Sequence, residues 1–363
     1  MSGKHLLVAV SSHGFGHLSQ VAPAVNSLKR LIPDLKITVR GAFDAARIRG
    51  RIPAVASIEA FADDIGMSMI NAVTTDIDAS TVALREFHLD WDRKVDALAE
   101  HLVRQQVDLV LADVPYLTLA AAERAGIPTV ALSSLNWADI FEDSLGHRID
   151  PALLNQIRGC YQSAQYFFQC APAMPMPWLK NKQAVGPVCS PGQSQRERLL
   201  RERQLPADTW LVLVSMGGVQ LDLNLQAWPM HIHGRPVHYL TQANLCGTHP
   251  HAISVDLLDF HYSDLIASAD LVVTKPGYGT FAEVACSGIP VIYLERNDWP
   301  ETAALTEWLH SVAHCHSVTY PQLNSAAIGA VMAGLLSGGR YPPVKPSGND
   351  EVAAVLAKLL GSL

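Results

Sequence analysis

Residues 274–283, Thr274-Lys275-Pro276-Gly277-Tyr278-Gly279-Thr280-Phe281-Ala282-Glu283, decide the fold. A buried-strand pattern precedes this stretch, and a helical pattern that ends at Gly288 follows it. A parallel strand that passes through a glycine-rich turn into a helix directs backbone N–H groups and the positive helix end to one point. The stretch therefore predicts an α/β fold with an anion site at this turn.

The residues within the turn suit a phosphate group. Gly277 and Gly279 allow a sharp turn and the close approach of an anion to the backbone, and Lys275 adds a positive charge. An ordinary strand–turn–helix connection remains the alternative. Thr280 and Glu283 also have the spacing of a capping box, in which the carboxylate binds the backbone N–H of Thr280.

Length and composition limit the architecture and the partners. The 363 residues exceed a usual single domain, so we expect two domains of about 170 residues each. A net charge of −7 argues against a nucleic-acid partner. No apolar run reaches the length of a transmembrane segment, and no signal-peptide pattern is present. Six scattered cysteines are typical of a reducing compartment, so we expect a cytoplasmic protein, free or peripheral at the inner face of the membrane.

A histidine-containing loop follows the first predicted strand, residues 6–12. His13, Gly14, Gly16 and His17 lie between this strand and a helix that Pro23 should restrict to a start near residue 19 or 20. Open α/β sheets bind ligands at this end of a parallel strand. The positive end of the helix disfavours protonation of His17, and a neutral imidazole can act as a general base. Alternatively, the histidine only hydrogen-bonds its own loop.

A carboxylate is predicted beside this histidine. The buried-strand pattern 107–112 ends at Asp113, on the same sheet edge as His17. Such a carboxylate would hold the second ring nitrogen of the imidazole, although Asp113 could equally cap the next helix. Asn136 and Trp137 follow a neighbouring strand and are candidates for an acceptor pocket.

The polar segment 63–80 is long enough to form a lid or an acceptor loop. Its Asp76-Ile77-Asp78 resembles a metal-binding motif, but this short pattern is more often a turn. The pairs His231/His233 and His249/His251 have no clear third ligand. We therefore expect no metal site.

A proline-dense segment, 171–177, indicates the end of the first domain. We place a first Rossmann-like domain at 1–170, a linker at 171–186, a second Rossmann-like domain at 187–345, and a C-terminal helix at 346–363.

The second domain offers further ligand contacts. A strand that ends at Gly217 and Gly218 faces the main turn and could add N–H groups to the anion site. Phe260 could stack on a base or fill the core. Asp298 and Glu301 lie in a polar loop that could bind a sugar, or they form an exposed helix entry.

With both ends of the predicted site described, the chain resembles GT-B glycosyltransferases of the UDP-sugar type. These include the cell-wall lipid-intermediate N-acetylglucosaminyltransferase and the plant and mammalian UDP-glycosyltransferases. The chain is more similar to the transferase-like N-terminal region of plant L-arabinokinases and its stand-alone bacterial relatives. It shares with them the run His13–His17 and the run Gly277–Glu283. The resemblance implies two doubly wound parallel-sheet domains that face each other across a cleft, with the acceptor on the first, the donor on the second, and the C-terminal helix packed back on the first.

The resemblance also implies residue roles. His17 would be the general base, Asp113 its support, and the Glu283 carboxylate a ligand of the nucleotide ribose. The chain departs from the plant pattern at Lys275, which replaces a histidine, and at Trp299, which replaces the glutamine after the sugar-binding aspartate. Tyr278-Gly279 replaces a tryptophan–asparagine pair.

These observations predict metal-independent, inverting transfer of a sugar from a nucleotide diphospho-sugar, expected to be UDP-linked, to a hydroxyl of a small or lipid-linked acceptor, without a cofactor. The candidate donor-binding residues are Gly217, Gly218, Phe260, Lys275, Gly277, Tyr278, Gly279, Thr280, Glu283, Asp298 and Glu301. A non-catalytic nucleotide-sugar-binding protein and a GT-B epimerase are alternatives. An NADP-dependent Rossmann enzyme is another, because Gly14-x-Gly16-x-x-Ser19 with Arg40 forms a loose dinucleotide fingerprint.

Overall fold

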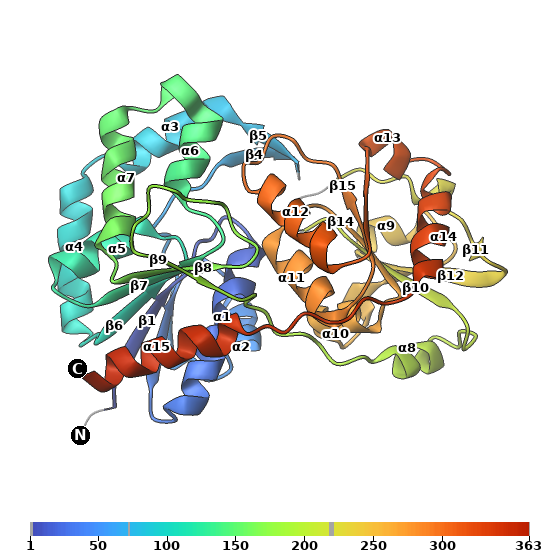
Figure 1. Ribbon diagram of the computed structural model, residues 1–363, viewed down its shortest axis with the longest axis horizontal. Coiled ribbons are helices and arrows are strands. Elements are labelled where there is room, and N and C mark those ends of the chain that lie inside the picture. The colour runs from blue at the N-terminus through green and yellow to red at the C-terminus, as the bar shows by residue number, and fades with distance from the viewer. Residues whose placement is uncertain (1–2, 72, 218–220, 363) are drawn as a thin grey trace.

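The computed structural model describes residues 3–71, 73–217 and 221–362, and these residues form two α/β domains that lie side by side (Figure 1). Each domain is built on a sheet of mainly parallel strands with helices on both faces. The α/β fold class expected from the sequence is confirmed. None of the described helices is long and apolar enough to cross a bilayer.

The sheet of the first domain has the strand order β3-β2-β1-β6-β7-β8-β9, and every pairing in it is parallel. Its central strands are runs of buried Leu, Val and Ala, because both faces of a parallel sheet are covered by helices. The strands are β1 (His5–Ala9), β2 (Lys36–Arg40), β3 (Ser57–Glu59), β6 (Leu109–Ala112), β7 (Thr129–Ser133), β8 (Tyr166–Cys170) and β9 (Lys182–Val185). The helices are α1 (Phe15–Leu31), α2 (Ala45–Arg51), α3 (Ile77–Phe87), α4 (Trp91–Arg104), α5 (Tyr116–Arg124), α6 (Trp137–Leu145) and α7 (Pro151–Ser163).

Local patterns in this domain misled the sequence analysis at several points. Helix α1 begins at Phe15, and Pro23 lies inside it, because packing of its apolar face against the sheet outweighs the missing backbone hydrogen bond. The polar segment 63–80 contains an antiparallel hairpin, β4 (Ser68–Asn71) and β5 (Thr74–Asp76). Strand β9 falls within the expected linker 171–186 and pairs with β8 in the first sheet.

The second domain has the strand order β11-β12-β10-β14-β15-β16, with β13 beside β12. The strands are β10 (Trp210–Ser215), β11 (His231–Ile232), β12 (Arg235–Thr241), β13 (Ala252–Ser254), β14 (Leu271–Thr274), β15 (Val291–Leu294) and β16 (Cys315–Val318). The helices are α8 (Arg196–Glu202), α9 (Ala243–Cys246), α10 (Tyr262–Ser268), α11 (Tyr278–Ser287), α12 (Thr302–Val312), α13 (Tyr320–Leu323) and α14 (Ile328–Gly338).

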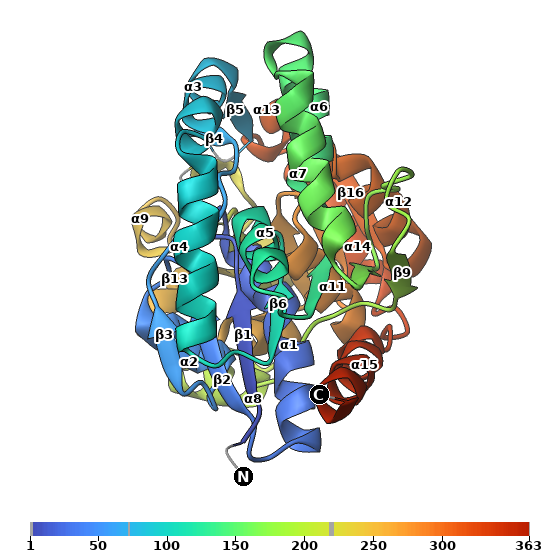
Figure 2. The same ribbon diagram turned by 90° about the vertical axis from the view of Figure 1, so that its left-hand side faces the viewer.

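The last helix, α15 (Gly348–Ser362), lies beside α1 of the first domain (Figure 2). Its buried Val352 and Leu356 belong to the same apolar cluster as Val21 and Val25 of α1. The Glu351 carboxylate also accepts a hydrogen bond from the backbone N–H of Gly186, at 3.1 Å. The first domain is therefore assembled from both ends of the described chain.

Candidate active site

A histidine–carboxylate pair lies at the edge of the first domain that faces the second. The first turn of α1 carries His17, and Asp113 follows β6. Nδ1 of His17 lies 2.7 Å from Oδ2 of the fully buried Asp113. Because Nδ1 faces the carboxylate, Nε2 is the ring nitrogen left for an incoming group.

Burial lowers the pKa of His17, but the carboxylates of Asp113, Asp64 and Glu301 outweigh it and raise the pKa above its usual value. The sequence analysis expected the helix end to keep the imidazole neutral. The negative charges next to the ring change its pKa more than the helix end does. The imidazole is therefore a stronger base than a free histidine.

A polar chain connects this pair to the second domain. The Gln20 amide, oriented to satisfy its neighbours, donates to Oδ1 of Asp113 at 3.0 Å and accepts from the backbone N–H of Ser134 at 3.2 Å. Oγ of Ser134 is also 2.5 Å from Oε1 of Glu301, in the loop before α12. Glu301 is buried, and this burial raises the pKa of its carboxyl. The predicted base and a predicted sugar ligand are thus parts of one network.

Asp64 is a site residue that the sequence analysis missed. Nε1 of Trp137 donates to its carboxylate at 2.6 Å. Burial raises the pKa of Asp64 to about 6, and its charge acts on His17. Nothing in the segment 63–80 distinguishes it from Asp63, because only the folded chain shows which carboxylate is turned toward the histidine.

Aromatic rings enclose His13. Its ring meets Trp137 edge-on at 5.0 Å between centroids, and it stacks on Trp299 of the second domain at 5.6 Å with an interplanar angle of 5°. Burial, together with the charges of His17, Arg296 and Lys275, lowers the pKa of His13 to about 3. His13 is therefore neutral and forms a wall of the site, while His17 is the basic member.

Gly66 fits closely against this wall, which gives a stability prediction. A Cβ atom at Gly66 would lie 2.4 Å from Nδ1 of His13 and 2.8 Å from Cη2 of Trp137. Gly66→Ala should lower the free energy of unfolding by about 1–3 kcal/mol, as overpacking does, measured by urea denaturation. Gly159→Ala is the matched control, because a Cβ at this helical position has no neighbour within 4 Å. Equal stability of the two variants would contradict the described packing.

The glycine turn at Gly277 lies beside the other glycine turn of the second domain, at Gly217. Gly277 precedes the first residue of α11, and the Cε atom of Lys275 would lie 3.2 Å from a Cβ at Gly217. Gly217 has φ +83, a conformation that favours glycine. Burial and the charge of Arg296 lower the pKa of Lys275 to about 8. Gly218 lies outside the described residues.

Hydroxyl groups line the same turns. The Tyr262 hydroxyl donates to Oγ of Ser215 at 2.9 Å and lies 3.4 Å from Oγ1 of Thr280. Ser215 ends β10, and Thr280 is in the first turn of α11. The two strand ends therefore meet in a polar corner that includes Lys275.

Other predicted ligands are used elsewhere in the fold. The Tyr278 hydroxyl accepts from the backbone N–H of Val188 at 2.9 Å and donates to the carbonyl of Ala171 at 3.3 Å, so it holds the connection between the domains. Asn136 caps α6, since its Oδ1 accepts from the backbone N–H of Asp139 at 2.9 Å. Phe260 lies under the guanidinium of Arg198, at 4.7 Å.

The remaining predicted donor ligands hold the two domains together. Glu283 pairs with Arg51 at the end of α2, at 3.2 Å, so the capping-box alternative does not describe its main contact. Oδ2 of Asp298 accepts from the backbone N–H of Thr75 at 2.9 Å and from its hydroxyl at 3.0 Å. The contact of Glu301 with Ser134 is of the same kind. In each case, a carboxylate of the second domain binds a residue of the first.

The first turns of α1 and α11 face each other across the domain boundary. A Cβ atom at Gly279 would lie 3.6 Å from Cα of Gly16 and 3.5 Å from Cβ of Ser19. Gly14 precedes α1 in extended backbone. The histidine loop and the predicted anion site are therefore neighbours in space, although about 260 residues separate them in the sequence.

Among the described residues, no group of three or more His, Cys, Asp or Glu side chains is arranged to hold a metal ion.

Known structures share the arrangement of two facing parallel α/β domains. The fold is that of the GT-B glycosyltransferases. The predicted GT-B architecture is thereby confirmed.

The comparisons that support this fold have low sequence identity. The glycotransferase of kitacinnamycin has a TM-score of 0.61 and 15% identity, over 100% of this chain and 96% of that one. A UDP-glucosyltransferase from Polygonum tinctorium has a TM-score of 0.61 and 14% identity, over 99% of each chain.

One curated relative resembles the chain in sequence. L-arabinokinase of Arabidopsis thaliana is 26% identical over 322 residues, which are 85% of this chain and 30% of that protein. The chain therefore spans less than a third of the length of this relative. No protein-family model matches the chain.

Proposed function

We propose that the protein transfers a sugar from a nucleotide diphospho-sugar to an acceptor hydroxyl, with inversion and without a metal ion. The observation that carries the proposal is the His17–Asp113 pair, which lies across the domain boundary from the glycine turn and Lys275. A base and an anion site on opposing domains are what such a transfer requires. UDP is the proposed nucleotide, because a structure with the same fold is named a UDP-glucosyltransferase.

In the proposed reaction, Nε2 of His17 takes the proton of the acceptor hydroxyl. The acceptor oxygen forms a bond to the anomeric carbon, and the bond between that carbon and the diphosphate oxygen breaks on the opposite face. Asp113 stabilises the imidazolium that results. The electron pair of the broken bond stays on the diphosphate, where the start of α11 and Lys275 stabilise the added negative charge.

The domain contacts imply that the site opens before the donor enters. The carboxylates that would bind the ribose and the sugar of the donor are already bound to Arg51, Thr75 and Ser134. The donor would displace these partners, and reclosure would exclude water from the reacting carbon. The hairpin β4–β5 carries Thr75, and it reaches the second domain next to α12 (Figure 1).

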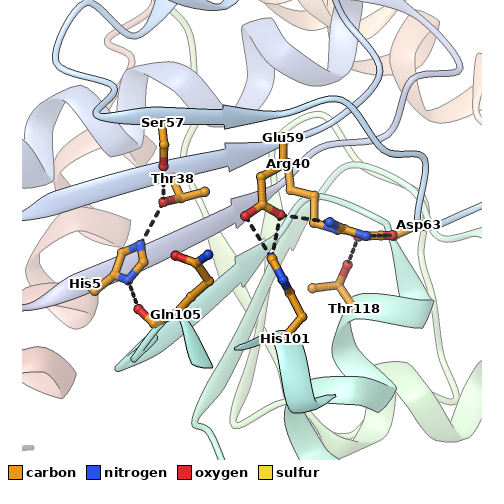
Figure 3. A network of polar contacts seen from close by, with 9 residues as sticks. All are labelled: His5, Thr38, Arg40, Ser57, Glu59, Asp63, His101, Gln105 and Thr118. Carbon is orange, nitrogen blue, oxygen red and sulfur yellow. Dashed lines mark hydrogen bonds and ion pairs between the residues drawn. The ribbon is translucent and has the colours of Figure 1, made fainter. Parts of the chain in front are cut away.

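The surroundings of Arg40 argue against the NADP alternative. Its guanidinium donates to Glu59 at 2.8 Å and binds Asp63, which also accepts a hydrogen bond from Thr118 at 2.8 Å (Figure 3). Glu59 in turn contacts His101 at 2.9 Å. An arginine held by two carboxylates has no free edge for a 2′-phosphate.

A thermal unfolding series with nucleotides tests the proposal. UDP and UDP-sugars should raise the melting temperature by mass action, and NADPH should leave it unchanged. Slow release of UDP from a UDP-sugar in the absence of an acceptor would distinguish an enzyme from a non-catalytic binding protein. A shift with NADPH alone would overturn the proposal, and product analysis would separate a transferase from an epimerase.

A further inference from the structure

Arg296, which follows β15, is a buried cation that the sequence analysis did not single out. Its side chain is 5% exposed. Nε donates to Oδ1 of Asp298 at 2.8 Å, and the guanidinium carbon lies 4.7 Å from the centre of the Trp299 ring. Nη2 is buried and has no hydrogen-bond partner among the described residues.

Nη2 is a strong donor that the protein leaves unused. A guanidinium stays charged at any physiological pH, and its planar N–H groups match the oxygens of a carboxylate or a phosphate. A buried donor without an acceptor is unfavourable, so an incoming acceptor would gain the full interaction. Asp298 accepts from Nε of Arg296 through Oδ1 and from Thr75 through Oδ2, and it forms no hydrogen bond with Nη2.

The position of Arg296 relates it to the anion site. Strands β14 and β15 are neighbours, with Thr274 opposite Tyr293. Lys275 and Arg296 therefore follow adjacent strand ends. The guanidinium of Arg296 packs on the Trp299 ring, and that ring stacks on His13 at 5.6 Å between centroids. The charge of Arg296 also lowers the pKa of Lys275 and of His13. Arg296 therefore lies beside the histidine loop and on the strand end next to that of the glycine turn.

We propose that Nη2 of Arg296 binds an anionic oxygen at the sugar end of the donor. This inference rests on the proposed function and adds a ligand requirement to it. Such an oxygen belongs either to the β-phosphate or to a carboxylate on the sugar, and the chemistry of recognition is the same for both. Arg296 would then act beside Lys275, so that two cations face the negative charges of the donor.

Calorimetric titration with UMP, UDP, UDP-glucose and UDP-glucuronate tests this assignment. Arg296→Gln removes the charge, and Arg296→Lys keeps it without the planar fork. Arg296→Gln should bind the affected probes about ten- to a hundredfold more weakly than wild type, and Arg296→Lys should recover part of the loss. Arg235→Gln is the matched control, because Arg235 also stacks on a tryptophan of the second domain. Its guanidinium carbon lies 3.5 Å from the centre of the Trp210 ring.

The pattern across the probes identifies the source of the anionic oxygen. An equal loss for UDP and both UDP-sugars, with UMP unchanged, assigns the β-phosphate. A loss confined to UDP-glucuronate assigns a carboxylate on the sugar. Unchanged binding of every probe, or an equal loss for UMP, overturns the inference. If Arg296→Gln does not fold, the comparison is made with Arg296→Lys. An equal loss of affinity for all four probes in that variant overturns the inference.

Failure of the inference and failure of the proposed function give different results. Wild-type protein that binds none of the four probes overturns the proposed function, and this inference with it. Wild-type protein that binds UDP, with no change in a folded Arg296 variant, overturns only the role of Arg296.

Discussion

Replacing His17 with alanine should lower the rate of sugar transfer by about 10²–10⁴-fold and leave nucleotide binding unchanged. The imidazole is the group that takes the acceptor proton in the proposed reaction, and Asp113 orients it at 2.7 Å. In the proposed function the nucleotide is bound by the other domain, so its affinity should not depend on this side chain. Transfer rates with a saturating donor, and calorimetric binding of UDP, measure the two effects separately.

The matched control for this substitution is His101→Ala. His101 also contacts a carboxylate, that of Glu59 at 2.9 Å, but it lies on α4 within the network of Figure 3. Its loss should reduce stability and leave the turnover per folded molecule unchanged. Turnover of His17→Ala within tenfold of wild type would refute the assignment of the base.

Replacing Asp113 with asparagine should lower the maximal rate by at least about a hundredfold and move the pH profile. The base must be unprotonated, so the wild-type rate should rise with pH through a pKa above the usual histidine value, since burial opposes protonation of His17 less than Asp113, Asp64 and Glu301 together favour it. Asparagine removes the charge that raises this pKa. The rise in rate should therefore occur at lower pH in the variant, and the plateau should be lower.

Asp108→Asn is the control at the opposite end of the same strand. Asp108 precedes β6, and its carboxylate accepts a hydrogen bond from the backbone N–H of His5 at 2.7 Å. This variant should keep the wild-type pH profile. A profile of Asp113→Asn that stays in place, or moves to higher pH, would contradict the electrostatic role of Asp113.

Much of the fold could be predicted from the sequence, because buried strands and glycine turns are local patterns. The apolar runs before Asp113 and Lys275 become β6 and β14, and the side chains at their ends face the domain boundary. The predictions failed where packing overrides a local preference. Pro23 inside α1 and strand β9 within the expected linker are examples.

Parts of the candidate site had no sequence signal because they depend on burial and on contacts that exist only in the folded chain. Trp299 looked like a simple departure from the plant pattern, yet it inserts into the apolar cluster of the first domain. Asp64 acquires its character from burial and from Trp137, which is distant in the chain. Arg296 acquires its character from burial beside Asp298 and Trp299 of its own loop. Which acidic residue of a polar loop turns inward depends on the assembled fold.

The position of α15 has a consequence for how the protein is made. Because α15 completes the apolar cluster around α1, the first domain cannot finish folding on the ribosome until the last residues of that helix have emerged. The N-terminal segments of the first domain therefore remain incompletely packed while the whole second domain is synthesised. Cutting the chain between the domains would therefore leave an N-terminal fragment with an uncovered apolar face, prone to aggregate, rather than a separable module.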